Sequence, residues 1–237
     1  MKTLCVAVVV LSLTSMCQAA SLACNELLKP VDTAPDLTGR WYVIAVSSDT
    51  CLVPAAVNAF LWPSFAYDAS SAQTPNIYKV TAKIKMYGYC ANESESFFYD
   101  KSHFFDLDKN NAPTGEPDVL LTTGCPDCLI LQTKDIDDEV IYLSKRQAVT
   151  TTELAEFGAQ AQCLGWYKPQ VFNSDHDYTN CKSFDDVDVD DDHSATSELI
   201  YQRWKTSYKI PFECFCEKGL SSVASVLEWI ENAWNSL

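Results

Sequence analysis

The side chains best suited to chemistry in this sequence are its three histidines. His103 borders the segment FFDLD, which has the composition of a strand, whereas His176 and His193 lie in polar segments farther along the chain. No motif of serine hydrolases, zinc peptidases or nucleotide-binding proteins supplies a catalytic partner for them. A lone histidine more often packs or forms a hydrogen bond than catalyses a reaction. We therefore predict that the protein is not an enzyme and uses no cofactor, with catalysis by His103 as the weaker alternative.

The segment CPDC contains two cysteines, Cys125 and Cys128, at the spacing of redox and metal motifs. A thioredoxin-like site would place them between a strand and a helix, whereas here they separate two expected strands. A zinc site would need a second pair, and CFC, with Cys214 and Cys216, has the wrong spacing. We favour structural disulfides, and one possible arrangement cross-links CPDC with CFC.

A run of aspartates near the C-terminal end imitates the start of a calcium-binding loop. Asp186, Asp188 and Asp190 have the required spacing. The sixth position, however, is Asp191 where glycine is needed, and the twelfth is Ser197 where glutamate is needed. We expect a solvated linker there and no metal site.

Charge and the N-terminal segment indicate where the protein works. The chain has 17 basic and 32 acidic residues, a formal net charge of −15, which disfavours nucleic acids and anionic membranes as partners. Residues 1–20 combine Lys2, an apolar run and small residues, as a secretory signal peptide does. We predict a secreted protein of plasma or another body fluid. Asn92 begins the single glycosylation sequon, Asn-Glu-Ser.

Cysteine usage is consistent with secretion. Of the 11 cysteines, Cys5 and Cys17 belong to the predicted signal peptide, which leaves nine. Disulfides are expected in an oxidising compartment. Because nine is odd, at least one cysteine is free or paired with another chain.

Eight segments of the chain have the alternation or composition of strands, and no helical segment separates them. In the clearest, residues 76–90, Tyr78 and Val80 lie on one face and lysines on the other. The others are 40–46, 59–68, 94–100, 102–108, 117–123, 128–134 and 139–146. We predict an all-β fold, an eight-stranded antiparallel up-and-down β-barrel, with a two-sheet sandwich as the alternative.

Two helices are expected after the strands. Thr150 and Glu153 form a capping box at the start of the first, which would pack on the barrel. The second, over residues 221–237, is amphipathic. Its apolar face comprises Val223, Val226, Leu227, Ile230 and Trp234. The resulting organisation is a signal peptide (1–20), a barrel domain (21–184), an acidic linker (185–198) and a disulfide-rich C-terminal extension (199–237).

Several motifs in this order resemble the lipocalin family. They are CNELLKP, the Gly-x-Trp of TGRWYVIAV, YCANES, LIL, TTTELAEFGAQAQCL and DYTNCKSF. Within that family the chain is most similar to the alpha-1-acid glycoprotein (orosomucoid) branch and its fish relatives, the saxitoxin-, tetrodotoxin- and tributyltin-binding plasma proteins. The resemblance covers residues 24–184. It does not account for the tail or for five further cysteines, which are Cys51, Cys125, Cys128, Cys214 and Cys216.

The resemblance implies three structural residues and two disulfides. Trp41 would fill the closed end of the barrel, and Gly39 would let the N-terminal arm approach closely. Arg146 would lie across the Trp41 indole in a cation–π contact, with Lys145 as the less favoured substitute. The implied disulfides are Cys24–Cys163 and Cys90–Cys181.

The alternation within the strands predicts which side chains face the interior and bind ligand. These are Phe65, Tyr67, Tyr78, Val80, Phe97, Tyr99, His103, Phe105, Ile130 and Tyr142. A slip of one residue in any strand would replace its set with the neighbouring residues.

We accordingly predict a carrier that reversibly binds a small hydrophobic or cationic amphiphilic ligand, such as a toxin, xenobiotic, steroid or lipid. Aromatic rings and carboxylates in a pocket would favour a cation. The prediction includes no nucleic acid partner and no membrane insertion. The alternative is a structural or protein-interaction role, in which the C-terminal helix or an unpaired cysteine builds an oligomer.

Overall fold

The computed structural model of the chain describes residues 23–134, 138–172, 175–183, 194–207, 209, 211–212 and 214. The predicted signal peptide, the run of aspartates, His193, Cys216 and the predicted helix over 221–237 lie outside the described residues. No helix within the described ranges is long and apolar enough to cross a membrane.

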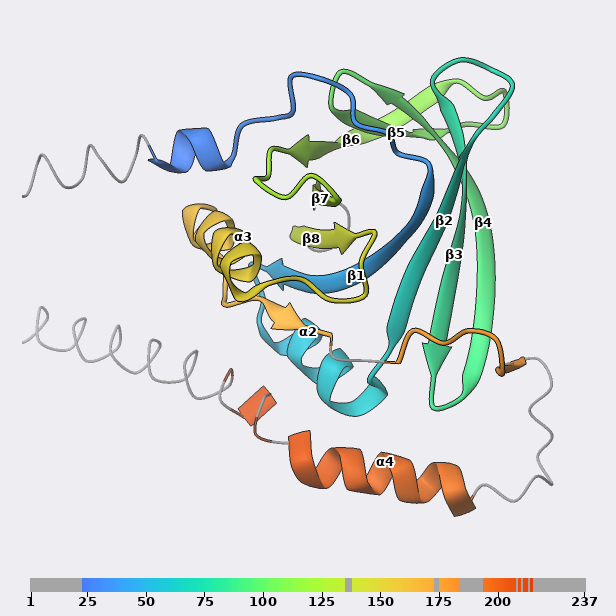
Figure 1. Cartoon of the computed structure of the whole chain (residues 1–237), viewed down its shortest axis with the longest axis vertical. Helices are drawn as coiled ribbons and strands as arrows, with labels where there is room; N and C mark the ends of the chain where they lie inside the picture. Colours follow the sequence, from blue (N-terminus) through green and yellow to red (C-terminus); the bar gives the residue numbers. More distant parts are fainter. Residues whose placement is uncertain are drawn as a thin grey trace, which may run out of the picture.

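Eight antiparallel strands form a closed barrel, as predicted (Figure 1). They are β1 (Gly39–Ser48), β2 (Ser64–Ser71), β3 (Ile77–Met86), β4 (Tyr89–Asp100), β5 (His103–Leu107), β6 (Pro113–Leu121), β7 (Cys128–Thr133) and β8 (Glu139–Ser144). Each strand pairs with the next, and β8 pairs with β1. This last pairing closes the sheet and distinguishes a barrel from a sandwich.

The segment between β1 and β2 differs from the prediction. Residues 59–61, expected to begin a strand, belong instead to a short helical turn, η1 (Val57–Leu61), which continues α2 (Leu52–Ala56). Trp62 follows in the left-handed conformation at φ 44°, and Pro63 precedes the first residue of β2. The apolar composition of this segment is therefore not that of a strand: Ala55 and Ala59 are buried, whereas Phe60 and Leu61 are exposed.

Helix α3 (Thr151–Cys163) packs on the outside of the barrel. The predicted capping box is present, because the Thr150 side chain accepts from the Glu153 backbone N–H and the Glu153 carboxylate accepts from the Thr150 backbone N–H. Phe157 stacks on Tyr142 of β8 with ring centroids 5.1 Å apart. The apolar face of α3 thereby covers β7 and β8, and a second core forms outside the barrel wall.

The chain after α3 wraps around the barrel. A short strand, β9 (Gln170–Val171), pairs with β1, and β10 (Lys182–Ser183) pairs with β4. Between them, the His176 Nδ1 and the Tyr178 hydroxyl each lie 2.7 Å from the Ser64 Oγ, and the His176 ring packs against Tyr42. These contacts fasten the segment to the outer face of β1 and β2.

Four disulfides join these parts. Cys24–Cys163 ties the N-terminal arm to α3, and Cys90–Cys181 ties β4 to the segment before β10, as the resemblance implies. The suggested cross-link between CPDC and CFC is wrong. Cys125 bonds to Cys128, and Cys214 bonds instead to Cys51. The tail is still tied to the body of the protein, but through the segment that follows β1.

Helix α4 (Ser194–Ser207) lies alongside η1 (Figure 1). The Arg203 guanidinium lies 5.0 Å from the centre of the Trp62 ring and donates to the Asn58 carbonyl at 3.0 Å. Burial lowers the pKa of Arg203, yet arginine remains charged at any ordinary pH. Together with Cys51–Cys214, this contact fixes the tail on the β1–β2 segment.

The burial of His176 beside Ser64 predicts that the stability of the protein depends on pH. Burial lowers the pKa of His176 in the folded protein, so the unfolded chain binds its proton at a higher pH. The free energy of unfolding should therefore fall as the pH drops below about 6.5. Thermal unfolding of a His176→Gln variant between pH 7.5 and 5 should show a smaller decrease in Tm than the unaltered protein. His103→Gln is the matched control, and an equal flattening in that variant would contradict the assignment.

Candidate ligand-binding site

A cavity of about 470 Å³ occupies the interior of the barrel, and all eight strands contribute to its lining. Its apolar wall is aromatic on one side and aliphatic on the other. The aromatic side comes from Phe65, Tyr67, Phe97, Phe104 and Phe105. Phe97 packs between Tyr78 and Phe104, with ring centroids at 5.4 and 4.9 Å, so the rings support one another. The volume falls within the range of sites for small organic ligands.

Trp41 forms the floor of the cavity. Its indole N–H donates to the Leu37 carbonyl at 2.8 Å, which satisfies the one polar atom of a ring that is almost fully buried. The cation over the indole is Lys145, with its Nζ 4.9 Å from the ring centre. The predicted preference for Arg146 is therefore wrong, and the less favoured residue takes the position.

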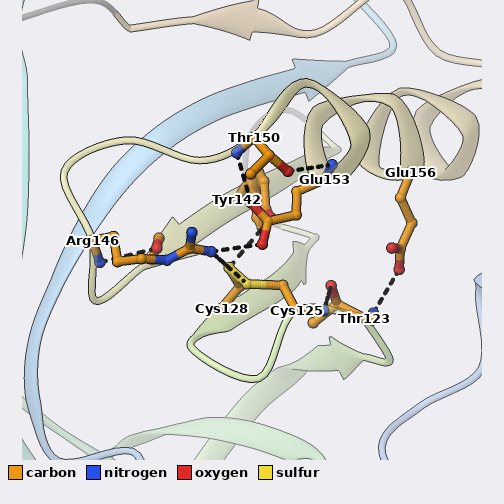
Figure 2. Close-up of a disulfide and its surroundings, with 10 residues drawn as sticks. Thr123, Cys125, Cys128, Tyr142, Arg146, Thr150, Glu153 and Glu156 are labelled. Carbon is orange, nitrogen blue, oxygen red and sulfur yellow. Dashed lines mark hydrogen bonds and ion pairs between the residues drawn. A yellow bond between two sulfur atoms is a disulfide. The ribbon is translucent and has the colours of Figure 1, made fainter.

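Arg146 points instead toward α3 (Figure 2). Its Nη2 donates to the Glu153 carboxylate at 2.7 Å and to the Cys125 sulfur at 3.1 Å. Hydrogen bonding from the Thr150 backbone, followed by that from Arg146, lowers the pKa of Glu153 and keeps it ionised. The guanidinium thus joins the last strand, the first turn of α3 and a disulfide.

Cys125, Cys128 and Glu153 lie close enough together to suggest a metal site, but their atoms are already engaged. Their ligand atoms lie within 4.8 Å of one another. The two sulfurs are bonded to each other, and the two Glu153 oxygens accept from Arg146 and from the Thr150 backbone. A thiolate is the form of cysteine that binds metals, so this cluster as it stands does not fit a metal ion.

Carboxylates from β4, β5 and β6 line one end of the cavity. They are Glu93, Glu95, Asp106, Glu116 and Asp118. The strand register shows which end this is. Glu139 at the start of β8 pairs with Ser48, at the opposite end of β1 from Trp41, and Thr133 pairs with Glu139. β6 is antiparallel to β7, so the start of β6 lies at the same end of the barrel as Thr133. Asp106 pairs with Thr114 near the start of β6 and therefore also lies at this end. The cavity is therefore apolar around Trp41, and its carboxylates lie among the aromatic side chains toward the other end, where Asp106 pairs with Phe97 and Asp118 with Phe104.

Tyr67 links the two regions of the cavity. Burial, followed by the nearby charges of Glu139 and Glu95, raises the pKa of Tyr67, so its hydroxyl stays protonated at neutral pH. Lys83, the basic residue of the lining, pairs with Asp68 at 3.1 Å. Among the residues that the structure describes, no ion pair forms to Glu93, Glu95, Asp106 or Glu116.

The predicted interior residues divide into three groups. Five of them line the cavity, namely Phe65, Tyr67, Val80, Phe97 and Phe105. Tyr78 and Tyr99 point inward but pack in the core beside the cavity. Ile130, Tyr142 and His103 do not face it, and their placement in the site is wrong.

The errors have identifiable physical causes. On β7 and β8, Ile130 and Tyr142 pack under α3, while Leu129, Leu131, Ile141 and Leu143 face the cavity. On β5, the register shifts between Phe104 and Asp106, so Phe104 and Phe105 both border the cavity. His103 is half-buried, and its ring donates to the Lys101 carbonyl at 2.9 Å.

The sequence prediction did not include the acidic residues of the cavity lining, although their positions in the strand indicated which way they face. Glu93 and Glu95 share the strand parity of Phe97 and therefore face the same side of β4. Charged residues on a strand are normally read as solvent-facing, which concealed their direction. Asn92, the predicted glycosylation site, has the opposite parity and therefore faces the other side of β4; Asn92, Glu93 and Glu95 are all exposed.

Comparison with known proteins shows that this chain is similar to solved structures but not to known sequences. No family model matches the sequence, and no curated protein is significantly similar to it. Similar solved structures include the siderocalin Ex-FABP (16% identity, TM-score 0.47), lipocalin 12 from rat epididymis (13%, 0.49) and odorant binding protein OBP1 (13%, 0.45). These matches cover 58%, 62% and 60% of this chain and 94%, 89% and 94% of the respective neighbours.

The cation over Trp41 predicts a small, specific contribution to stability. Lys145→Gln should lower the free energy of unfolding by about 0.5–1 kcal/mol, because it removes a cation–π contact at a partly exposed site together with a weak ion pair to Asp36 at 3.7 Å. Urea denaturation measures this loss. Lys145→Arg keeps the cation and should unfold like the unaltered protein. Equal losses in the two variants would show that the contact with the indole does not stabilise the fold.

Proposed function

We propose that this protein is a secreted lipocalin-type carrier that reversibly binds a small hydrophobic or cationic amphiphilic molecule inside its barrel. The observation that carries the proposal is that the cavity combines an apolar floor around Trp41 with carboxylates that lie among aromatic rings, and four of these carboxylates form no ion pair among the described residues. A toxin, a basic xenobiotic or another amphiphile with one cationic group has the matching chemistry. The resemblance to the alpha-1-acid glycoprotein branch belongs to the same proposal.

Binding would combine two separate physical effects. The carbon skeleton of the ligand would be buried against Phe97, Phe104 and the leucines of β7 and β8, which contributes about 25 cal/mol per Å² of apolar surface. Its cationic group would lie near Glu93 and Glu95, whose side chains are exposed, so the charge attraction would be modest and reduced by salt. No covalent step is needed, so release follows from simple dissociation.

Secretion is part of the proposal. The signal-peptide pattern, the four disulfides and the net charge of −15 are consistent with an extracellular fluid. The acidic chain would also attract cationic ligands toward the barrel before contact.

Removing charge from the carboxylates of the cavity should selectively weaken the binding of cations. Diphenylhexatriene and its trimethylammonium derivative share an apolar body and differ in one positive charge. We expect a Glu93→Gln/Glu95→Gln variant to bind the cationic dye about five- to tenfold more weakly, as expected for the loss of partly exposed charge interactions, with the neutral dye changed less than twofold. Fluorescence titration at low and high salt measures both affinities.

Asp100→Asn is the matched control, because Asp100 lies exposed at the other end of β4. It should change neither affinity. Preserved binding of the cationic dye by the double variant would refute the role of these carboxylates, whereas failure of the unaltered protein to bind either dye would refute the carrier itself.

A second candidate function, self-association, is favoured by a different observation. All of the large hydrophobic side chains that are exposed in the described residues lie on three neighbouring segments. They are Leu52, Val53, Phe60 and Leu61 on the β1–β2 segment, Val171 on β9, and Leu199, Ile200, Tyr201, Trp204 and Phe212 on the tail. Asn58 joins these segments, because its amide donates to the Val171 carbonyl and its own carbonyl accepts from Arg203.

A second copy of this chain is the occupant we propose for this apolar surface. Contiguous exposed apolar patches mark interaction sites. The four disulfides use eight of the nine cysteines expected in the secreted chain, and Cys216, two residues beyond Cys214, is the ninth. An odd cysteine in a secreted chain can link two copies covalently.

Charges placed on this surface should abolish assembly and leave the cavity intact. Ile200 and Trp204 lie one helical turn apart on α4, 43% and 51% exposed. Sedimentation velocity should show a dimer for the full chain and a monomer for Ile200→Glu/Trp204→Glu, with unchanged dye affinities. Gln202→Glu/Thr206→Glu adds the same charges on the opposite face of α4, where both residues are exposed, and should stay dimeric. Cys216→Ser separates covalent from non-covalent association. A monomeric full chain would rule out this function.

A further inference from the structure

The Cys125–Cys128 disulfide lies at the start of β7, beneath the side chain of Arg146 and close to the first turn of α3 (Figure 2). Both half-cystines are buried, at 3% and 5% exposure. The intervening Pro126 and Asp127, and Gly124 just before them, are exposed. The disulfide is therefore covered by a surface turn on one side and by a guanidinium on another.

Both sulfurs accept hydrogen bonds from donors that would stabilise negative charge. Arg146 Nη2 lies 3.1 Å from the Cys125 sulfur and 3.8 Å from the Cys128 sulfur. The Tyr142 hydroxyl donates to the Cys128 sulfur at 3.3 Å. Burial raises the pKa of Tyr142 to about 12, so this hydroxyl retains its proton at neutral pH. Among the half-cystines in the described part of the chain, Cys125 and Cys128 are the ones whose sulfurs accept hydrogen bonds from side chains.

This disulfide also closes a much shorter loop than the others. Its cysteines are three residues apart, whereas the other three disulfides span 91 to 163 residues. The stabilisation that a disulfide provides by restricting the unfolded chain grows with loop length. Opening Cys125–Cys128 therefore removes less stabilisation than opening any of the other three, which hold the arm, the tail and the segment after α3.

We propose that Cys125–Cys128 is a thiol–disulfide exchange site that small thiols reduce while the barrel remains folded. The exposed residues Gly124, Pro126 and Asp127 provide the approach, and the buried position of the sulfurs favours a small thiol over a protein. The donors on both sulfurs favour the reduced pair over the disulfide, because they stabilise a thiolate more than they stabilise an S–S bond.

The exchange consumes two equivalents of the small thiol. A thiolate attacks the Cys128 sulfur, the S–S bond breaks, and the bonding electron pair leaves with Cys125 as a thiolate beside Arg146. A second thiolate attacks the external sulfur of the mixed disulfide and releases Cys128. The products are two protein thiols, once protons are taken from solvent, and one external disulfide, so the two electrons come from the external thiols.

The negative charge of Glu153 should affect the disulfide equilibrium in the opposite direction to the positive charge of Arg146. Its carboxylate shares the guanidinium with the sulfurs and adds negative charge near them. Removing the positive charge with Arg146→Gln should therefore favour the disulfide, and removing the negative charge with Glu153→Gln should favour the dithiol. Glutamine at position 153 can still form the capping box, so the start of α3 is preserved.

The test is an equilibrium titration of the folded full chain in buffers of reduced and oxidised dithiothreitol, with acid quenching, alkylation and mass mapping of each cysteine. We expect Cys125 and Cys128 to become alkylated together at ratios where the other three disulfides remain closed and the far-ultraviolet circular dichroism is unchanged. Arg146→Gln should shift the equilibrium about tenfold toward the disulfide, and Glu153→Gln about threefold toward the dithiol, as expected for charged hydrogen-bond partners.

Tyr142→Phe keeps the stacking on Phe157, removes only the hydroxyl, and should shift the equilibrium toward the disulfide. Tyr142→Phe replaces Arg146→Gln in this test if Arg146→Gln does not fold. Opening of all four disulfides together, opening only with loss of the barrel, or an unchanged equilibrium in these variants would each overturn the proposal.

Discussion

The pairing of β8 with β1 is the constraint on which the rest of the structure depends. It leaves no open edge on the eight-stranded sheet, so the strands enclose a volume instead of stacking on another sheet. β1 also pairs with β2 and β9, and its inward residues Trp41 and Val43 belong to the core around the cavity. Because β1 contacts three strands and holds the floor, both the closure and the shape of the cavity depend on this single strand.

The second layer of the structure follows from that closure. A closed barrel still has an outer face, and on β7 and β8 this face is apolar because α3 covers it. Arg146 joins the end of β8 to the first turn of α3 through Glu153, and the same guanidinium reaches the Cys125–Cys128 disulfide. The carboxylates of the cavity, by contrast, come from β4, β5 and β6.

The inward-facing side chains could be predicted from the sequence where a strand has one buried face and one face exposed to water. On β3, lysines alternate with apolar residues, and Val80 was placed correctly. On β7 and β8 both faces are covered, one by the cavity wall and one by α3, so alternation disappears and Ile130 and Tyr142 were assigned to the wrong side. Inward-facing charges such as Glu93 contradict the usual rule for strands. The partner of Cys51 could not be predicted either, because spacing alone does not determine disulfide connectivity.

The Cys51–Cys214 disulfide changes the covalent topology of the molecule. It joins the end of the described tail to the segment just after β1, which encloses most of the chain in a covalent ring. A single proteolytic cut between Ser183 and Ser194 would open this ring without dividing the protein. The barrel and α4 would remain one covalent molecule of unchanged mass apart from one added water, and only a cut combined with reduction would separate them.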